Sequence, residues 1–161
     1  MHCLCDDEER GQEVDDFVRL YRVEYPGAVR LAFALTADAQ AAEDIVQEAF
    51  LRTHDRIAML ESPGGYLRVT VVNLCHDEHR RRGREQRFRT LMPVRNNVAL
   101  DARELLDVLA RLPYRQQAVL ILRYWSDWSE AEIAQALGCR PGAVKSLASR
   151  GLARLKKELP Q

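Results

Sequence analysis

Polar and basic side chains with the spacing of a DNA-reading helix lie between Ser129 and Lys157. The segment predicts a helix, a glycine turn at Gly138 and a second, longer helix that Pro141 can open. Hydroxyl and cationic groups on such a helix can contact base edges and hold phosphates. The groups that fall outside its apolar stripe are Lys145, Ser146, Ser149, Arg150, Arg154 and Lys157.

Capping and periodicity support this helix-turn-helix. Ser129 and Glu132 have the spacing of a capping box, and Trp128 and Ile133 that of a hydrophobic staple. Apolar residues recur every three or four positions in the second helix, at Val144, Leu147, Ala148, Leu152, Leu155 and Leu159. An ordinary surface helix with a solvated basic face remains the alternative.

The chain has 161 residues and a formal net charge of zero, but its charges are separated along the sequence. Residues 1–78 carry a balance of −9 and residues 79–161 a balance of +9. This asymmetry favours a basic partner for the first half and an acidic partner, such as nucleic acid, for the second.

The four cysteines do not indicate a disulfide framework or a complete metal site. His2, Cys3 and Cys5 lie close together but lack further ligands, and Cys75 falls on an apolar helix stripe. No nucleophile–base pair, phosphate loop or catalytic metal set is present, so we expect no enzyme and no cofactor. No signal core or membrane-length apolar run is present, so we expect a cytoplasmic protein without membrane insertion.

The pattern predicts an all-α chain with two small helical domains joined by a linker. We expect an acidic, disordered segment at 1–12, a first domain at 13–83, a linker at 84–100 and a second domain at 101–161. The predicted helices are residues 14–24, 26–35, 38–55, 62–82, 101–111, 113–125 and the helix-turn-helix. Phe17, Leu20, Tyr21, Leu31 and Leu35 are core candidates in the first two.

The helix over residues 38–55 has one buried stripe and one acidic face. The predicted stripe is Ile45, Val46, Ala49, Phe50 and Thr53. The opposite face surrounds an exposed leucine and suits binding to another helix pair: Asp44, Gln47, Glu48, Leu51 and Arg52. A solvated face with one stray leucine is the alternative.

The helix over residues 62–82 combines an aromatic ring, an amide and a terminal arginine cluster. Tyr66, Asn73, His76 and Arg80 lie away from its apolar stripe, and the helix ends in the run from His79 to Arg84. Rings that stack on bases and guanidinium groups that hold phosphates favour single-strand binding. The loop from His54 to Glu61 is a candidate wall for an extruded base. A helix with a basic solvated end is the alternative.

The order of these motifs resembles an extracytoplasmic-function sigma factor, the smallest class of the bacterial sigma-70 family. AEDIVQEAFLR (42–52) resembles the core-polymerase-binding helix, and PGGYLRVTVVNLCHDEHRRR (63–82) resembles the minus-ten promoter helix. LPYRQQAVLILRYWSDWSEAEIAQALGCRPGAVKS (112–146) resembles region four, which reads the minus-thirty-five element.

The resemblance implies partners and roles. The partners are core RNA polymerase, through its β′ clamp helices and β subunit, promoter DNA and an anti-sigma factor. The acidic face at 44–52 would bind polymerase. The minus-ten element would contact His54, Arg56, Tyr66, Asn73, His76, Arg80, Arg81 and Arg82. The minus-thirty-five element would contact Arg140, Lys145, Ser146, Ser149, Arg150 and Arg154.

Three positions depart from the family's pattern. Tyr66 stands where a tryptophan is usual, Leu147 replaces an arginine and Gly151 replaces an alanine. We expect Leu147 to pack, and Gly151 to cost the helix about 1 kcal/mol. Two other functions are weighed against the sigma factor: a DNA-binding regulator that acts alone, and a metal or redox switch at His2, Cys3 and Cys5.

Overall fold

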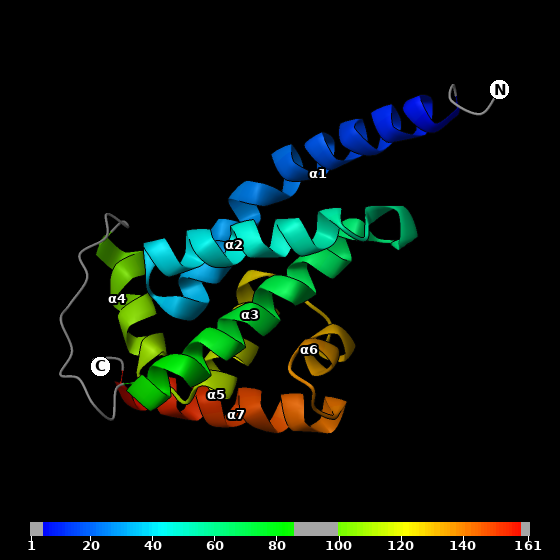
Figure 1. Ribbon diagram of the computed structural model, residues 1–161. Helices are drawn as coiled ribbons and strands as arrows, with labels where there is room; N and C mark the ends of the chain where they lie inside the picture. Colours follow the sequence, from blue (N-terminus) through cyan, green and yellow to red (C-terminus); the bar gives the residue numbers. More distant parts are fainter. Residues whose placement is uncertain (1–4, 86–99, 159–161) are drawn as a thin grey trace.

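The computed structural model describes residues 5–85 and 100–158, and all regular structure in these ranges is helical (Figure 1). The first domain contains α1 (Cys5–Thr36), α2 (Ala39–His54), the short 3-10 helix η1 (Ile57–Met59) and α3 (Pro63–Glu85). The second contains α4 (Leu100–Ala110), α5 (Tyr114–Leu120), the π-helical turn η2 (Ile121–Trp125), α6 (Glu130–Ala136) and α7 (Pro141–Glu158). The predicted all-α class with two small domains is confirmed, and most of the linker predicted at 84–100 lies outside the described residues.

Helix α1 corrects two predictions. We expected disorder up to residue 12 and, at Pro26, either the first turn of a new helix or a kink. One helix runs from Cys5 to Thr36 with Pro26 inside it, so Pro26 does not begin a new helix (Figure 1). Buried residues continue on the far side of the proline, at Ala28, Leu31 and Ala32, so packing against the bundle sustains the helix.

Helices α2 and α3 begin where the sequence predicts. The Asp38 side chain accepts a hydrogen bond from the Ala41 amide at 3.0 Å, and Ser62 Oγ accepts one from the Gly65 amide at 3.3 Å. The predicted stripe of α2 is buried in full, and Leu67, Val71 and Cys75 of α3 are buried against it. Tyr21 of α1 was expected in the core but is 41% exposed, although its ring contacts those of Tyr25 and Phe50.

The helix-turn-helix forms as predicted. The Ser129 side chain accepts from the Glu132 amide, and the Glu132 side chain accepts from the Ser129 amide, which completes the capping box. Gly138 adopts a φ of +59°, which a residue with a side chain rarely adopts. Helix α7 then begins at Pro141. Its apolar stripe is only partly buried. Val144 and Ala148 are buried, Leu147 is half-buried, and Leu152 is 43% exposed. Leu159 lies outside the described residues.

Gly151 lets α7 approach α5 closely. A methyl group added at Gly151 would lie 3.1 Å from Leu120 Cδ1 and 3.4 Å from Gln116 Cβ. Gly151 itself is buried in this contact. The glycine that weakens the helix by its own propensity therefore has a packing role in the second domain.

The two domains pack against each other. Their buried residues form one continuous cluster, and α3 lies next to α6. Gln117 of α5 donates a buried hydrogen bond from Nε2 to the Ala34 carbonyl of α1, at 3.2 Å. Figure 1 shows α3 between α2 and the second domain. This shared packing adds buried surface to two halves that are each small.

Candidate polymerase and DNA interfaces

The acidic face of α2 points into solvent. Leu51 at its centre is 62% exposed, and Asp44, Gln47, Glu48 and Arg52 around it are exposed as well. Arg52 Nε lies 2.7 Å from Glu48 Oε1 one turn earlier, and this ion pair borders the leucine. An isolated apolar side chain ringed by polar groups has the composition of an interface anchor.

The loop before α3 brings two predicted minus-ten residues together. The Arg56 guanidinium lies over the Tyr66 ring, 5.9 Å from its centroid, which is within reach of a cation–π contact. Met59 in η1, which lies between Arg56 and Tyr66 in the sequence, is 78% exposed. The ring of His54 contacts α1 instead: it packs edge-on against Phe17, with the ring centroids 4.8 Å apart.

The middle of α3 meets the second domain. Asn73 is exposed, as the single-strand hypothesis requires. His76, another predicted minus-ten residue, stacks on the ring of Tyr114 in α5, with centroids 5.3 Å apart. His79 stacks on the same tyrosine at 4.6 Å. In this arrangement the second domain covers part of the face predicted to bind the minus-ten element.

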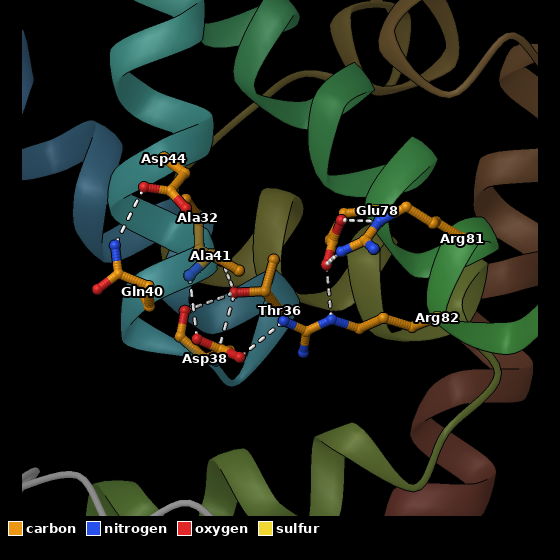
Figure 2. Close-up of polar contacts among 9 residues, drawn as sticks. All are labelled: Ala32, Thr36, Asp38, Gln40, Ala41, Asp44, Glu78, Arg81 and Arg82. Atoms are coloured by element: carbon orange, nitrogen blue, oxygen red, sulfur yellow. Dashed lines mark hydrogen bonds and ion pairs between the residues drawn. The ribbon is translucent and has the colours of Figure 1, made fainter. Parts of the chain in front are cut away.

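The arginines at the end of α3 are not equivalent (Figure 2). Arg80 is exposed and makes no hydrogen bond or ion pair within the described part of the chain. Arg81 pairs with Glu78 at 2.8 Å. Arg82 pairs with Glu78 through Nε and with Asp38 through Nη2, each at 2.7 Å.

These ion pairs set the protonation of the carboxylates. Hydrogen bonds from Arg81 lower the pKa of Glu78 against the effect of partial burial, and Arg82 lowers it further. Partial burial favours a raised pKa for Asp38, but the Ala41 amide and Arg82 together outweigh it and lower the pKa. Both carboxylates are therefore ionised at neutral pH.

Helix α7 presents its predicted DNA-contacting residues to solvent. They are all exposed, as is Arg140, which lies just before the helix: Lys145, Ser146, Ser149, Arg150 and Arg154. Lys145 Nζ lies 3.7 Å from Glu130 Oε2 of α6, which is a loose contact. Arg150 Nε donates to the Ser146 carbonyl at 3.3 Å. Leu147 packs against the core, so the expectation that it turns inward is confirmed.

An apolar groove of about 720 Å³ lies where α1 faces the second domain. Phe33 of α1 and Leu105 of α4 line it, together with Tyr124 and Trp125 of η2 and Leu152 of α7. The last four of these are exposed although they are large and apolar. Such a patch is typical of a protein-binding surface.

Sequence patterns did not indicate the contacts between the domains. Tyr114 and Gln117 lie in the helix predicted after Pro113, and no local pattern shows that Tyr114 contacts α3 or that Gln117 contacts α1.

Cys75 is buried as predicted, and burial raises the pKa of its thiol to about 12. No group of metal-ligating side chains occurs within the described residues, and His2 and Cys3 lie outside them. Among the described helices, none is long and apolar enough to cross a membrane.

Comparison with known families agrees with the division of the chain into two helical domains. Residues 20–85 match the family described as Sigma-70 region 2, and residues 102–155 match Sigma-70, region 4. The chain belongs to the extracytoplasmic-function group of the sigma-70 family of RNA polymerase sigma factors, which bind core polymerase and promoter DNA.

Similar proteins cover both domains. An RNA polymerase sigma-E factor of Streptomyces coelicolor is 34% identical over 157 residues, which span 91% of this chain and 88% of the relative. An ECF RNA polymerase sigma factor, SigL, of Mycobacterium tuberculosis is 34% identical over 134 residues, 73% of each chain. The Bartonella quintana sigma factor RpoE, solved with the anti-sigma factor NepR, superposes with a TM-score of 0.76 and 26% identity over 89% of this chain and 96% of that chain.

Proposed function

We propose that three separate helix faces of this chain carry out the steps of promoter-specific initiation. The exposed face of α2 around Leu51 binds the β′ clamp helices of core polymerase. The loop from His54 to Glu61 and the face of α3 with Tyr66 and Asn73 capture the unpaired minus-ten strand. Helix α7, together with Arg140 just before it, reads the minus-thirty-five element through residues up to Arg154.

The observation that carries this proposal is the exposure of Leu51. A leucine that is 62% exposed on a helix whose other stripe is fully buried has no role in the fold of this domain. The polar side chains beside it do not contact the second domain in any described hydrogen bond or ion pair. The face is therefore available to a partner in the arrangement seen here, in which the two domains pack against each other; we call this the closed arrangement.

We also propose that the closed arrangement is the inactive form and that an anti-sigma factor holds it. Tyr114 covers His76 on the promoter face of α3, so DNA binding there requires the domains to separate. The RpoE structure, which superposes on 89% of this chain, was solved in complex with an anti-sigma factor, NepR. The apolar groove beside Phe33 and Leu105 offers such a partner a surface that touches both domains. We place this regulation in the cytoplasm.

The test is transcription in vitro from a genomic promoter library with core polymerase and this chain. We expect transcripts from a defined set of promoters, and far fewer of them when Leu51→Asp replaces the wild-type chain at the same limiting concentration. If the chain binds the same DNA without core and adds no transcription with it, it is a regulator that acts alone. If an anti-sigma factor binds the apolar groove, it should stop transcription directed by the wild-type chain but not transcription directed by the Leu105→Asp variant.

A further inference from the structure

Arg82 joins the last turns of α3 to the start of α2 (Figure 2). Its Nη2 lies 2.7 Å from Asp38 Oδ2, across 44 residues of sequence, and its Nε lies 2.7 Å from Glu78 Oε1 in its own helix. The side chain is 32% exposed, compared with 55% for Arg81. Short, partly buried bonds to two carboxylates hold this guanidinium in one position.

The two oxygens of Asp38 divide their roles. Oδ1 accepts from the Ala41 amide at 3.0 Å and caps α2, while Oδ2 accepts from Arg82. Thr36 Oγ1 lies 3.4 Å from the Asp38 amide and donates to the Ala32 carbonyl at 2.8 Å, so the segment between α1 and α2 is held as well. One carboxylate therefore begins the helix proposed to bind polymerase and anchors the end of the helix proposed to bind DNA.

The charge of this cluster is balanced. Asp38 and Glu78 oppose Arg81 and Arg82, so the four side chains together present no net positive charge to a phosphate. A phosphate would have to replace two carboxylates at Arg82. Arg80, two residues earlier, has no such competitor among the described residues and is exposed.

We infer that Arg82 is a positioning residue, which fixes the promoter helix α3 against the N-cap of the polymerase-binding helix α2 and binds no phosphate itself. This inference rests on the roles proposed above for the two helices. Its consequence is that the polymerase face and the minus-ten face keep one relative orientation when core polymerase binds. We call the ion pairs of Arg82 with Asp38 and Glu78 the brace. Loss of the brace then impairs melting of the promoter duplex, although every DNA-contacting side chain remains.

Three substitutions separate this role from a DNA contact. Arg82→Gln and Asp38→Asn each remove the brace, and Asn at position 38 still caps α2. Arg80→Gln is the matched control, because it removes the same charge from the same helix without touching a carboxylate. Each variant is assembled with core polymerase, and open complexes are measured at saturating chain together with the salt dependence of promoter binding.

We expect Arg82→Gln and Asp38→Asn to reduce open complexes to a similar extent, and the double variant to be no worse than either alone. Their log–log salt slopes stay at the wild-type value. Arg80→Gln flattens the slope by about 0.7 to 0.9, as expected for one lost phosphate. A flatter slope in Arg82→Gln, combined with full or improved DNA binding by Asp38→Asn, would overturn the inference, because Asp38→Asn releases Arg82 to bind phosphate.

Denaturant unfolding of the free chain tests the brace without polymerase. We expect the losses of stability in Asp38→Asn and Arg82→Gln to be non-additive, and those in Asp38→Asn and Arg80→Gln to add. Additive losses in the first pair would refute the brace whatever the transcription result. Failure of the wild-type chain to initiate with core polymerase would instead refute the proposed function, so the two failures are distinguishable.

Discussion

The ring of Tyr114 in α5 stacks on the imidazole of His79 in α3, with centroids 4.6 Å apart and an interplanar angle of 24°. His76 stacks on the same tyrosine, so one aromatic ring of the second domain contacts two histidines of α3. The Tyr114 hydroxyl is buried and has no hydrogen-bond partner in the described structure. A buried hydroxyl without a partner costs about 1–3 kcal/mol, so this contact is weaker than its area suggests and suits a reversible closure.

Substitutions at Tyr114 should change closure in opposite directions. Tyr114→Ala removes the stacked ring and should raise the radius of gyration measured by X-ray scattering, while Tyr114→Phe removes only the unpaired hydroxyl and should favour closure. Tyr21→Ala is the control, because Tyr21 packs on Tyr25 and Phe50 within the first domain. An unchanged radius in Tyr114→Ala would mean that the ring does not hold the domains together.

Closure should weaken in acid. Partial burial against Tyr114 lowers the pKa of His76 and His79 from the usual 6.5, and neighbouring cations add to the effect. The charged side chains that act on the two imidazoles are Arg80, Arg82, Arg115 and, with the opposite sign, Asp77. Since the open form binds protons more readily, the contribution of the two imidazoles to closure is fully present above about pH 6.5 and is lost as the pH falls through their lowered pKa values.

Fluorescence transfer between dyes on the two domains measures this pH dependence. We expect the transfer efficiency to drop as the pH falls below about 6.5 in the wild-type chain. The double variant His76→Gln and His79→Gln removes both titrating groups and should give a flat profile in that range. An equal drop in the double variant would assign the transition to other groups.

Leu51→Asp should disrupt binding to core polymerase without unfolding the chain. We expect a loss of about 2 kcal/mol, roughly thirtyfold in affinity, as for an interface anchor. Met59→Asp is the control, since Met59 is also exposed but lies outside the acidic face. Binding is measured by fluorescence anisotropy of labelled chain against core polymerase. Equal affinities for the two variants would remove α2 as the polymerase face.

Arg150→Ala should weaken promoter binding and flatten its salt dependence, because each duplex phosphate contact contributes about −0.9 to the log–log slope. Lys145→Ala should act in the same direction, since Lys145 is held only loosely by Glu130. Arg111→Ala removes an equal charge from the same domain at a pair with Glu158 and should leave the slope unchanged. Titrations at several salt concentrations with the minus-thirty-five duplex provide the slopes.

Gly151→Ala should stabilise the chain by less than the helix propensity difference of about 1 kcal/mol. The added methyl group meets Leu120 Cδ1 at 3.1 Å, but Leu120 borders the apolar groove and can shift into it. Gly151→Val should destabilise the chain, because its larger, β-branched side chain crowds both Leu120 and Gln116. Thermal unfolding of both variants tests this, and a gain of the full propensity difference for alanine would mean that the contact is not tight.

Local rules were enough to predict most of the elements. Caps such as Asp38 and Ser129 begin their helices because a side-chain oxygen meets an unpaired amide within the same few residues. The buried stripe of α2 and the exposed Leu51 follow from helical spacing alone. Pro26 is the exception, because packing of the residues beyond it outweighed the local cost of a proline in a helix.

The sequence by itself determined the helices, their apolar faces and the order of motifs that marks a sigma factor, since each depends on residues within a few turns of one another. Only the tertiary structure decided which cations are engaged and which faces are covered. The pairing of Arg82 with Asp38 and the stacking of Tyr114 on His76 join residues far apart in the chain. Such contacts depend on how whole helices pack, and helical periodicity contains no information about them.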